Sequence, residues 1–332
     1  MNRRTFLTST GATAVCSRAL AAVDGLDHRN ERADIMPYRQ LGRTKFMCSR
    51  LIFGCGAALA GGRAVRLLDR AFEAGVNYYD IGSNDYYKGA ENYLAPFLKA
   101  HRADVWVTSK GYARTGDELT PNQSPSLEQA KTAATFWTGL VEQSLKNLDT
   151  EYIDAYFTQG TNSTALLKSE EMGRAFEKLR AEGKIKHAGI STHENAAAVL
   201  EAAVDTGWYD LAMVAVTPGG WYDWKNKVML EGTPPLKTIR PQLDRARDAG
   251  LGIIGMKVAR FIAGAVAGGR GEPATYDPLY NAALLQSPLN SWQRAYAYVL
   301  ENGVDAVNSD MQNLKHFEEN LTAVRTSREY FA

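Results

Sequence analysis

The sequence is poor in cysteine, which excludes the small folds that disulfides hold together. Only three of its 332 residues are cysteines, Cys16, Cys48 and Cys55, and they form neither a CxxC pair nor a cluster with histidine. Structural zinc sites need about four such ligands at short spacing, so we predict no metal site. A Cys48–Cys55 disulfide is one option. The other is two free thiols, and Cys55 lies in an apolar stretch, where a buried free thiol is the commoner state.

An excess of charge of either sign is also absent. Lysine and arginine together number 38 and aspartate and glutamate 37, so the formal net charge is +1. This balance indicates no basic surface for nucleic acid or for an anionic membrane. Past the first residues no apolar run is long enough to span a bilayer, so we expect no membrane insertion of the mature chain. With 45% apolar and 23% charged residues, the composition is typical of one large globular domain.

A glycine-rich dinucleotide fingerprint, G-x-G-x-x-G, is missing after the first predicted strand. Residues 264–271 are rich in glycine, but they lie in a late loop with no suitable strand before them. The open doubly wound sheet is the alternative to the architecture predicted below, and this absence argues against it.

The first residues resemble an export signal rather than part of a fold. Arg3 and Arg4 precede Phe6 and a mildly apolar run, and residues 19–21 form an Ala-Leu-Ala cleavage pattern. This is similar to a twin-arginine signal peptide over residues 1–21, which would place the mature protein in the periplasm. A disordered basic N-terminus is the other explanation. Residues 22–36 are polar without periodicity, and we predict a flexible linker there.

Strands and helices alternate strictly from residue 37 to residue 326. Short apolar runs typical of buried strands are followed by stretches with apolar residues at helical spacing. The expected strands cover residues 51–56, 76–80, 104–110, 153–157, 186–191, 211–216, 251–257 and 306–308. The expected helices cover residues 63–74, 93–98, 127–148, 170–182, 195–206, 241–249, 292–300 and 314–324. Eight such units predict an α/β fold of the (β/α)8 TIM-barrel type in a single domain.

Two neighbouring strands end on ionisable residues. The run that ends at Asp80 is followed by Tyr86 and Tyr87, and the next strand ends at Lys110. Because the carboxyl ends of parallel strands open into one pocket, we expect these side chains to meet. An ammonium lowers the pKa of a nearby phenol, and a carboxylate holds the lysine charged, so the three can form one proton-transfer unit. One ionisable residue at a strand end is more often an ordinary boundary residue; the repetition favours catalysis.

Several short motifs, in this order and at these spacings, carry a family resemblance. They are Tyr38-Arg39-Gln40-Leu41-Gly42-Arg43-Thr44, Asn77 to Asp80, Val107-Thr108-Ser109-Lys110, Gly189-Ile190-Ser191, Gly250 to Lys257, and Glu318-Glu319-Asn320-Leu321. The chain from about residue 37 to residue 324 thereby resembles the aldo/keto reductases, barrel enzymes that use NADPH. The resemblance implies a hydride transfer that interconverts a carbonyl and an alcohol.

The family uses a tetrad of Asp, Tyr, Lys and His, and the resemblance assigns Asp80 and Lys110 to it directly. The tyrosine position holds Asp85 here, so one residue looks inserted and we prefer Tyr86, with Tyr87 as the alternative. Gln159 stands where the family has histidine. An amide can still donate a hydrogen bond to a carbonyl oxygen, but it cannot titrate. His193, just past the next strand, is either a spatial substitute or a polar residue at the start of a helix.

The resemblance also implies a site for NADP(H), with NAD(H) as the alternative. The residues that match the family's cofactor contacts are Ser191 for the nicotinamide carboxamide, Lys257 at the end of the seventh strand, and Glu319 and Asn320 for the adenine. The chain departs from the family at Met213, at Val216 or Thr217, and at His316, where the family has a glutamine, an aromatic residue and an arginine, respectively. The departure at His316, beside Lys315, suggests a weaker preference for NADPH.

We therefore predict an exported NAD(P)(H)-dependent oxidoreductase acting on a small molecule. Trp221, Tyr222 and Trp224 follow the sixth strand and suit the flat faces of sugars or other cyclic substrates, although they could simply pack the loops. The alternative is a barrel that has lost hydride transfer and acts as a binding protein, a lyase or an isomerase. The natural substrate, the reaction direction and the oligomeric state do not follow from the sequence.

Overall fold

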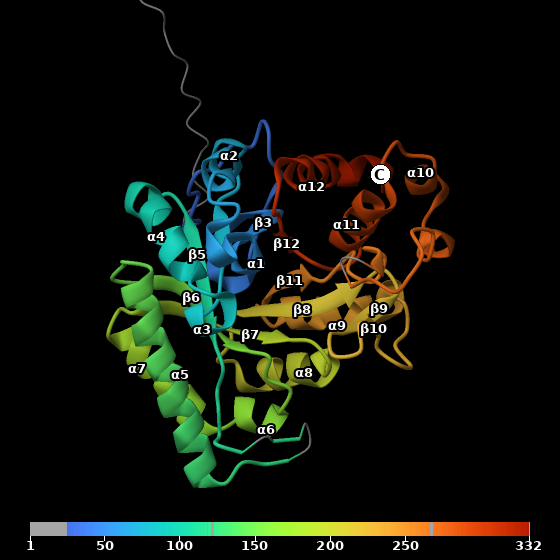
Figure 1. Cartoon of the computed structure of the whole chain (residues 1–332). Coiled ribbons are helices and arrows are strands. Elements are labelled where there is room, and N and C mark those ends of the chain that lie inside the picture. The colour runs from blue at the N-terminus through green and yellow to red at the C-terminus, as the bar shows by residue number, and fades with distance from the viewer. Residues whose placement is uncertain (1–24, 118, 121–122, 266–267, 332) are drawn as a thin grey trace, which may run out of the picture.

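Eight parallel strands close into a barrel at the centre of the molecule (Figure 1). A computed structural model describes residues 25–117, 119–120, 123–265 and 268–331. The barrel strands are β3 (Leu51–Gly54), β4 (Tyr78–Asp80), β5 (Trp106–Gly111), β6 (Ile153–Gln159), β7 (Ile185–Thr192), β8 (Leu211–Thr217), β11 (Gly252–Met256) and β12 (Ala306–Asp310). They pair in the order β8-β11-β12-β3-β4-β5-β6-β7, and β7 pairs with β8 to close the ring. The predicted (β/α)8 barrel in a single domain is confirmed.

Helices between the strands cover the outside of the barrel (Figure 1). They are α1 (Cys55–Leu59), α2 (Leu67–Glu73), α3 (Asn84–Tyr87), α4 (Ala90–His101), α5 (Leu127–Asn147), α6 (Thr164–Leu167), α7 (Glu170–Ala181), α8 (Ala196–Thr206), α9 (Leu236–Asp248), α10 (Ala282–Leu285), α11 (Ser291–Glu301) and α12 (Leu314–Thr326). In α5 a capping box of Ser126 and Gln129 starts the helix. Trp137 then packs inward from α5, and its indole nitrogen donates to the Phe157 carbonyl of β6 at 3.3 Å.

Inward-facing side chains fill the barrel in layers contributed by alternate strands. One layer holds Tyr78, Ala155, Leu211 and Ala306, from β4, β6, β8 and β12. Two residues further along the same strands stand Asp80, Phe157, Met213 and Asn308. This second layer lies directly below the carboxyl ends of the strands. It therefore places one carboxylate and one amide at the floor of the barrel mouth, which is the opening at the carboxyl ends of the strands.

The amino-terminal end of the barrel is closed by the hairpin of β1 (Tyr38–Gln40) and β2 (Met47–Ser49). Phe46 is fully buried and stacks on Trp106 with ring centroids 4.7 Å apart. Residues 25–36, predicted as a flexible linker, instead pack onto the barrel: Met36 is 1% exposed, and Arg29 donates to Asp154 at 2.9 Å. Polarity alone was misleading there, because the charged residues have buried partners. Residues 1–21, the predicted signal, lie outside the described residues.

Two expected element boundaries need correction, and of the two options for the cysteines the free thiols are confirmed. Cys55 begins α1 instead of continuing a strand, and α9 begins at Leu236 with Pro241 inside it. Cys48 and Cys55 are both free and buried, and burial raises the pKa of each thiol. The hairpin of β9 (Gly220–Asp223) and β10 (Val228–Met229), which extends β8, was not predicted. Within the described ranges, no helix combines the length and apolarity needed to cross a membrane.

Candidate active site at the carboxyl end of the barrel

Asp80 and Lys110 form a buried ion pair at the ends of neighbouring strands. The Lys110 ammonium donates to Oδ1 of Asp80 and to the Ile81 carbonyl, each at 2.5 Å. The second oxygen, Oδ2 of Asp80, accepts a hydrogen bond from Nδ2 of Asn308, also at 2.5 Å. Burial raises the pKa of Asp80, and Lys110 and Asn308 offset part of that rise. Two of the predicted site residues thus meet as expected, together with a third that no motif indicated.

The two candidate tyrosines lie in α3, the single helical turn that follows β4. Tyr86 is 45% exposed, and its ring meets the Tyr87 ring edge-on at 4.6 Å. Tyr87 is partly buried, with its ring between Gly56 and Gly82. A Cβ atom at Gly56 would lie 2.6 Å from Cζ of Tyr87, and one at Gly82 would lie 2.8 Å from Cε2. Both glycines are therefore needed to admit this ring, which packs against the ends of the first two barrel strands.

The surroundings of Tyr87 disfavour its ionised form. Burial raises the pKa of the Tyr87 hydroxyl, and the negative charge of Asp80 adds to this effect. A raised pKa keeps the phenol protonated but makes it a weaker proton donor, so these surroundings alone do not activate Tyr87. Among the hydrogen bonds of the described residues, neither tyrosine hydroxyl is bonded to the Lys110 amine.

Gln159 ends β6 on the same side of the mouth. Its Oε1 is buried without a hydrogen-bond partner among the described residues and would lie 3.5 Å from a Cβ at Gly82, the glycine that flanks the Tyr87 ring. Gln159 also lines a cavity of about 340 Å³. The other lining residues are Tyr112, Ala113, Arg114, Thr115, Gly116, Asp117, Leu119, Gly160, Thr161, Asn162, Ser163 and Leu166. The cavity is thus bounded by the loops after β5 and β6, and a small polar molecule could reach Gln159 through it.

His193 lies just beyond β7 and stacks on Trp224, with ring centroids 5.9 Å apart. Burial lowers the pKa of His193 to about 3, and the positive charges of Lys257, Lys227 and Lys110 contribute. The imidazole is therefore neutral at any physiological pH and cannot serve as an acid there. It shares the mouth with Lys110 but does not restore the titrating histidine of the tetrad.

Cations gather around Trp224 on the other side of the mouth. Lys227, Lys257 and Arg260 approach the centre of the indole to 2.9, 4.1 and 5.4 Å. Of the carboxylates that the structure describes, none lies within 4.0 Å of these three groups. Both lysines adopt a positive φ, 62° and 64°, which is uncommon outside glycine and often marks functional sites. Burial, more than the nearby Arg260, lowers the pKa of Lys257 to about 8.

The remaining predicted cofactor residues fall into two groups. Ser191 is buried on β7, in register with Gln159 of β6, and so belongs to the mouth. Glu319 and Asn320 lie on α12, where Asn320 donates to the Ser309 hydroxyl at 2.7 Å and Glu319 accepts from Asn290 at 3.4 Å. Ser309 belongs to β12, so α12 is held against the last strand. This places Asn320 close to the rim of the mouth.

A family model described as "Aldo/keto reductase family" matches residues 53–218, half of the chain. The chain belongs to the aldo/keto reductase family.

Similar proteins are consistent with this membership. An uncharacterized oxidoreductase of Bacillus subtilis, YqkF, is 31% identical over 165 residues, which cover 47% of this chain and 49% of YqkF. The match therefore spans about half the length of that relative. The holo form of the aldo-keto reductase AKR11C1 from Bacillus halodurans superposes with a TM-score of 0.62 at 23% identity, over 87% of this chain and 91% of that one. This structural likeness shows the shared fold.

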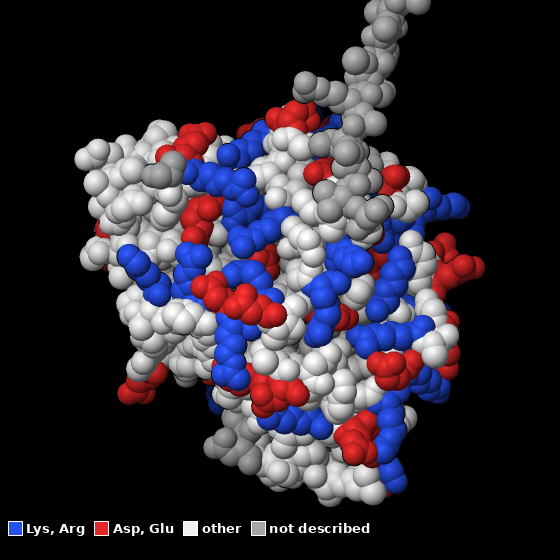
Figure 2. Space-filling model, turned by 180° about the vertical axis from the view of Figure 1, so that it is seen from behind, with Lys and Arg blue, Asp and Glu red and all other residues white. Residues whose placement is uncertain are grey.

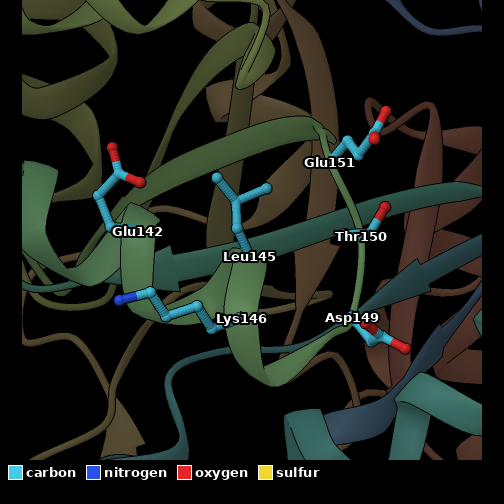
Figure 3. A pocket seen from close by; sticks show the side chains of 6 residues that line it. All are labelled: Glu142, Leu145, Lys146, Asp149, Thr150 and Glu151. Atoms are coloured by element: carbon cyan, nitrogen blue, oxygen red, sulfur yellow. The ribbon is translucent and has the colours of Figure 1, made fainter.

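A second hollow of this aldo/keto reductase, of about 480 Å³, lies away from the mouth (Figure 3). It is lined by Glu142, Leu145, Lys146, Asp149, Thr150 and Glu151, at the end of α5 and in the loop that leads into the start of β6. Its carboxylates point away from one another (Figure 3). No group of three potential metal ligands occurs in the described part of the chain. We assign this hollow no part in the chemistry, because it opens near the amino end of a strand whose carboxyl end carries Gln159.

Proposed function

We propose that this protein is an NAD(P)(H)-dependent oxidoreductase that interconverts a carbonyl and an alcohol. The observation that carries the proposal is the buried Lys110–Asp80 pair at the carboxyl end of the barrel, with a tyrosine ring packed against the same strand ends. Neutralising a buried lysine with a carboxylate keeps the ammonium in place, and such a charge is what a tyrosine needs to release a proton at moderate pH.

Proton transfer to the substrate oxygen is the step that these residues would perform. In the reducing direction a tyrosine hydroxyl donates its proton to the oxygen that becomes the alcohol, and the Lys110 ammonium stabilises the phenolate that is left. The nicotinamide, when bound, supplies the hydride. The sequence predicts Tyr86 as the donor, whereas the inward packing of the Tyr87 ring favours Tyr87.

Gln159 would orient the carbonyl rather than exchange protons with it. Its amide nitrogen can donate to the substrate oxygen while its unpartnered Oε1 accepts from a neighbouring hydroxyl of the substrate. The amide does not titrate, so the acid–base behaviour of the reaction would belong to the tyrosine, Lys110 and Asp80. The cavity beside Gln159 would admit a small carbonyl compound or alcohol, of which a sugar or another cyclic molecule is one class.

The cations around Trp224 fit the phosphates of a dinucleotide. Lys227, Lys257 and Arg260 converge on one indole without a described carboxylate partner, and the buried Nε of Arg260 has no hydrogen-bond partner among the described residues. Like charges brought together in this way repel one another unless an anion joins them. NADP(H) is the proposed cofactor, with NAD(H) as the alternative, and Ser191 would meet the nicotinamide amide. Glu319 and Asn320 would face the adenine end.

Export by the twin-arginine pathway and a periplasmic location complete the proposal. They depend on residues 1–21, which resemble such a signal. Proteins exported in this way are folded beforehand, which would let a bound nucleotide cross with the chain.

Cofactor titration of the purified mature protein tests the central proposal. NADPH or NADH should quench the tryptophan fluorescence, because Trp224 lies among the proposed phosphate-binding cations. A panel of carbonyl compounds and alcohols, followed at the nicotinamide absorbance band, should then reveal turnover. Quenching without turnover of any compound would favour the alternative of a binding protein. Absence of both would favour a barrel with cofactor-independent activity, such as a lyase or isomerase.

A further inference from the structure

The last strand of the barrel places an amide against the Asp80 carboxylate. Asn308 stands two residues after Ala306 on β12, so it faces the barrel interior in the same layer as Asp80. Its Nδ2 donates to Oδ2 of Asp80 at 2.5 Å, while Lys110 binds Oδ1. The carboxylate is therefore held at one oxygen from β5 and at the other from β12.

The Asn308 amide occupies space that the lack of a side chain at Gly54 leaves open. A Cβ atom at Gly54 would lie 2.7 Å from Oδ1 of Asn308, and the Met213 sulfur is 3.3 Å from Nδ2. Oδ1 itself is buried without a hydrogen-bond partner among the described residues. A buried acceptor without a partner destabilises a fold. An apolar residue would fill this position more easily, since Phe157 and Met213 occupy the equivalent positions on β6 and β8. The benefit of an amide at this position is its hydrogen bond to Asp80.

We infer that Asn308 is a positioning residue for the Asp80–Lys110 pair. By donating to the second oxygen, it stabilises the ionised carboxylate and fixes its plane, so that the first oxygen keeps the Lys110 ammonium in place. None of the motifs that carry the family resemblance contains Asn308. Its effect on catalysis rests on the proposed function, whereas its effect on the charge of Asp80 does not.

The effect on Asp80 has a definite sign. Burial raises the pKa of Asp80 in the folded protein, and the Asn308 hydrogen bond opposes this rise. A group whose pKa is higher in the folded than in the unfolded protein destabilises the fold as it ionises. This loss of stability develops as the pH rises from the unfolded-state pKa through the folded-state pKa. Removing the hydrogen bond raises the pKa further, so the added loss of stability grows with pH. The ionisable groups that act on Asp80 or respond to it are Lys110, Lys257, Cys55, Tyr78 and Tyr87.

The test compares Asn308→Leu with the matched control Met213→Leu. Both changes put leucine into the same layer, but only the first removes a donor from Asp80. Urea unfolding of each full-length variant would be measured between about pH 4 and pH 8, where the Asp80 contribution develops. We expect the midpoint of Asn308→Leu to fall further below the wild-type midpoint as the pH rises. The difference between Met213→Leu and the wild type should stay constant with pH.

Turnover provides a second readout if the proposed function holds. For Asn308→Leu we expect kcat to fall about tenfold and the acid limb of the pH–rate profile to move up by about one unit. The KM for the nucleotide should change little. Wild-type protein without nucleotide-linked turnover would refute the proposed function and leave the unfolding comparison to decide the role of Asn308. A pH-independent stability loss in Asn308→Leu, like that of Met213→Leu, would overturn the inference whether or not the protein is active.

Discussion

Tyr86 and Tyr87 are neighbours in one helical turn, yet their rings have different surroundings. Consecutive residues of a helix point about 100° apart, so only one of the two can face the barrel. The family spacing with one inserted residue predicts Tyr86, but the space between Gly56 and Gly82 is filled by Tyr87. The exposed Tyr86 ring instead packs edge-on against Tyr87. It also contacts Tyr112, and the centroids of the Tyr86 and Tyr112 rings are 5.8 Å apart.

We expect Tyr87→Phe to lower kcat about a hundredfold or more, because loss of a general acid removes that much acceleration. Tyr86→Phe, the matched control, should keep a kcat close to that of the wild type, because its hydroxyl lies outside the packed ring site. Steady-state kinetics on any substrate found in the carbonyl panel would measure both. The opposite outcome, with Tyr86→Phe inactive, would show that the donor is the tyrosine that the sequence predicts.

Lys257 should make nucleotide binding dependent on pH. Its pKa is lowered to about 8, so in the free protein the amine loses its charge as the pH rises through that value. A phosphate group binds the charged form, and the Kd for NADPH should therefore rise between about pH 7 and pH 9.5.

Fluorescence titrations of the wild type, Lys257→Met and Lys237→Met would measure this dependence. The exposed Lys237 of α9 lies on the surface and serves as the control. We expect Lys257→Met to bind NADPH more weakly and to lose the added pH dependence, while Lys237→Met behaves like the wild type. If the Kd of Lys257→Met for NADPH depended on pH as steeply as that of the wild type, another group would be responsible for the titration.

At the scale of elements, alternate strands of the barrel begin in a common way. Asn77, Asp154, Asp210 and Asp305 stand at the starts of β4, β6, β8 and β12. Three of them accept a backbone N–H from the preceding segment or neighbouring strand, from Ser49, Val107 and Ile253 at 2.8, 3.0 and 2.8 Å. The three aspartates also bind arginines, which neutralises them at this end. The amino ends of the strands thus serve stability, and the carboxyl ends carry the candidate site.

Asp154 is the most heavily engaged of these residues. Arg29, Arg102 and Lys186 lie 2.9, 2.9 and 3.1 Å from its buried carboxylate. We expect Asp154→Asn to lower the free energy of unfolding by about 3–5 kcal/mol at neutral pH, because it leaves cations without their partner. Denaturant unfolding at neutral pH would measure the loss.

Acidification should reduce the difference in the free energy of unfolding between Asp154→Asn and the wild type. Although burial alone would raise the pKa of Asp154, the three cations lower it below its ordinary value. A group whose pKa is lower in the folded protein stabilises the fold when the pH lies above the unfolded-state pKa. This contribution disappears as the pH falls through the lowered, folded-state pKa. A difference that stays constant down to about pH 3 would show that the carboxylate charge is not what matters.

At the scale of the whole molecule, the amino-terminal residues complete the barrel. Residues 25–36 and the β1–β2 hairpin cover the end opposite the mouth, and Arg29 reaches across to the Val105 carbonyl and Asp154. Seen from behind, lysines and arginines alternate with aspartates and glutamates over the surface (Figure 2). On that face, basic side chains therefore have acidic neighbours.

A pair of truncations tests the role of this segment. Removal of residues 1–24, which keeps every described contact, gives the reference melting temperature. Removal of residues 1–36 also deletes Met36 and Arg29, and it should lower the melting temperature by about 2–4 °C for each kcal/mol of lost stability. Calorimetry would compare the two. Equal melting temperatures would mean that residues 25–36 behave as the linker that the sequence predicts.

The sequence by itself determined the architecture and the first members of the site. The eight-fold alternation is a local property, since each strand or helix shows its periodicity within about ten residues, and Asp80 and Lys110 are visible near the ends of their strands. Only the tertiary structure decided which tyrosine faces inward, and it alone brought Asn308 to Asp80 across 228 positions of the chain. It also gathered Lys227, from the β9–β10 turn, with Lys257 and Arg260, from the loop after β11, around Trp224. Closure of the barrel sets β12 beside β3, and no local pattern records which distant side chains that closure joins.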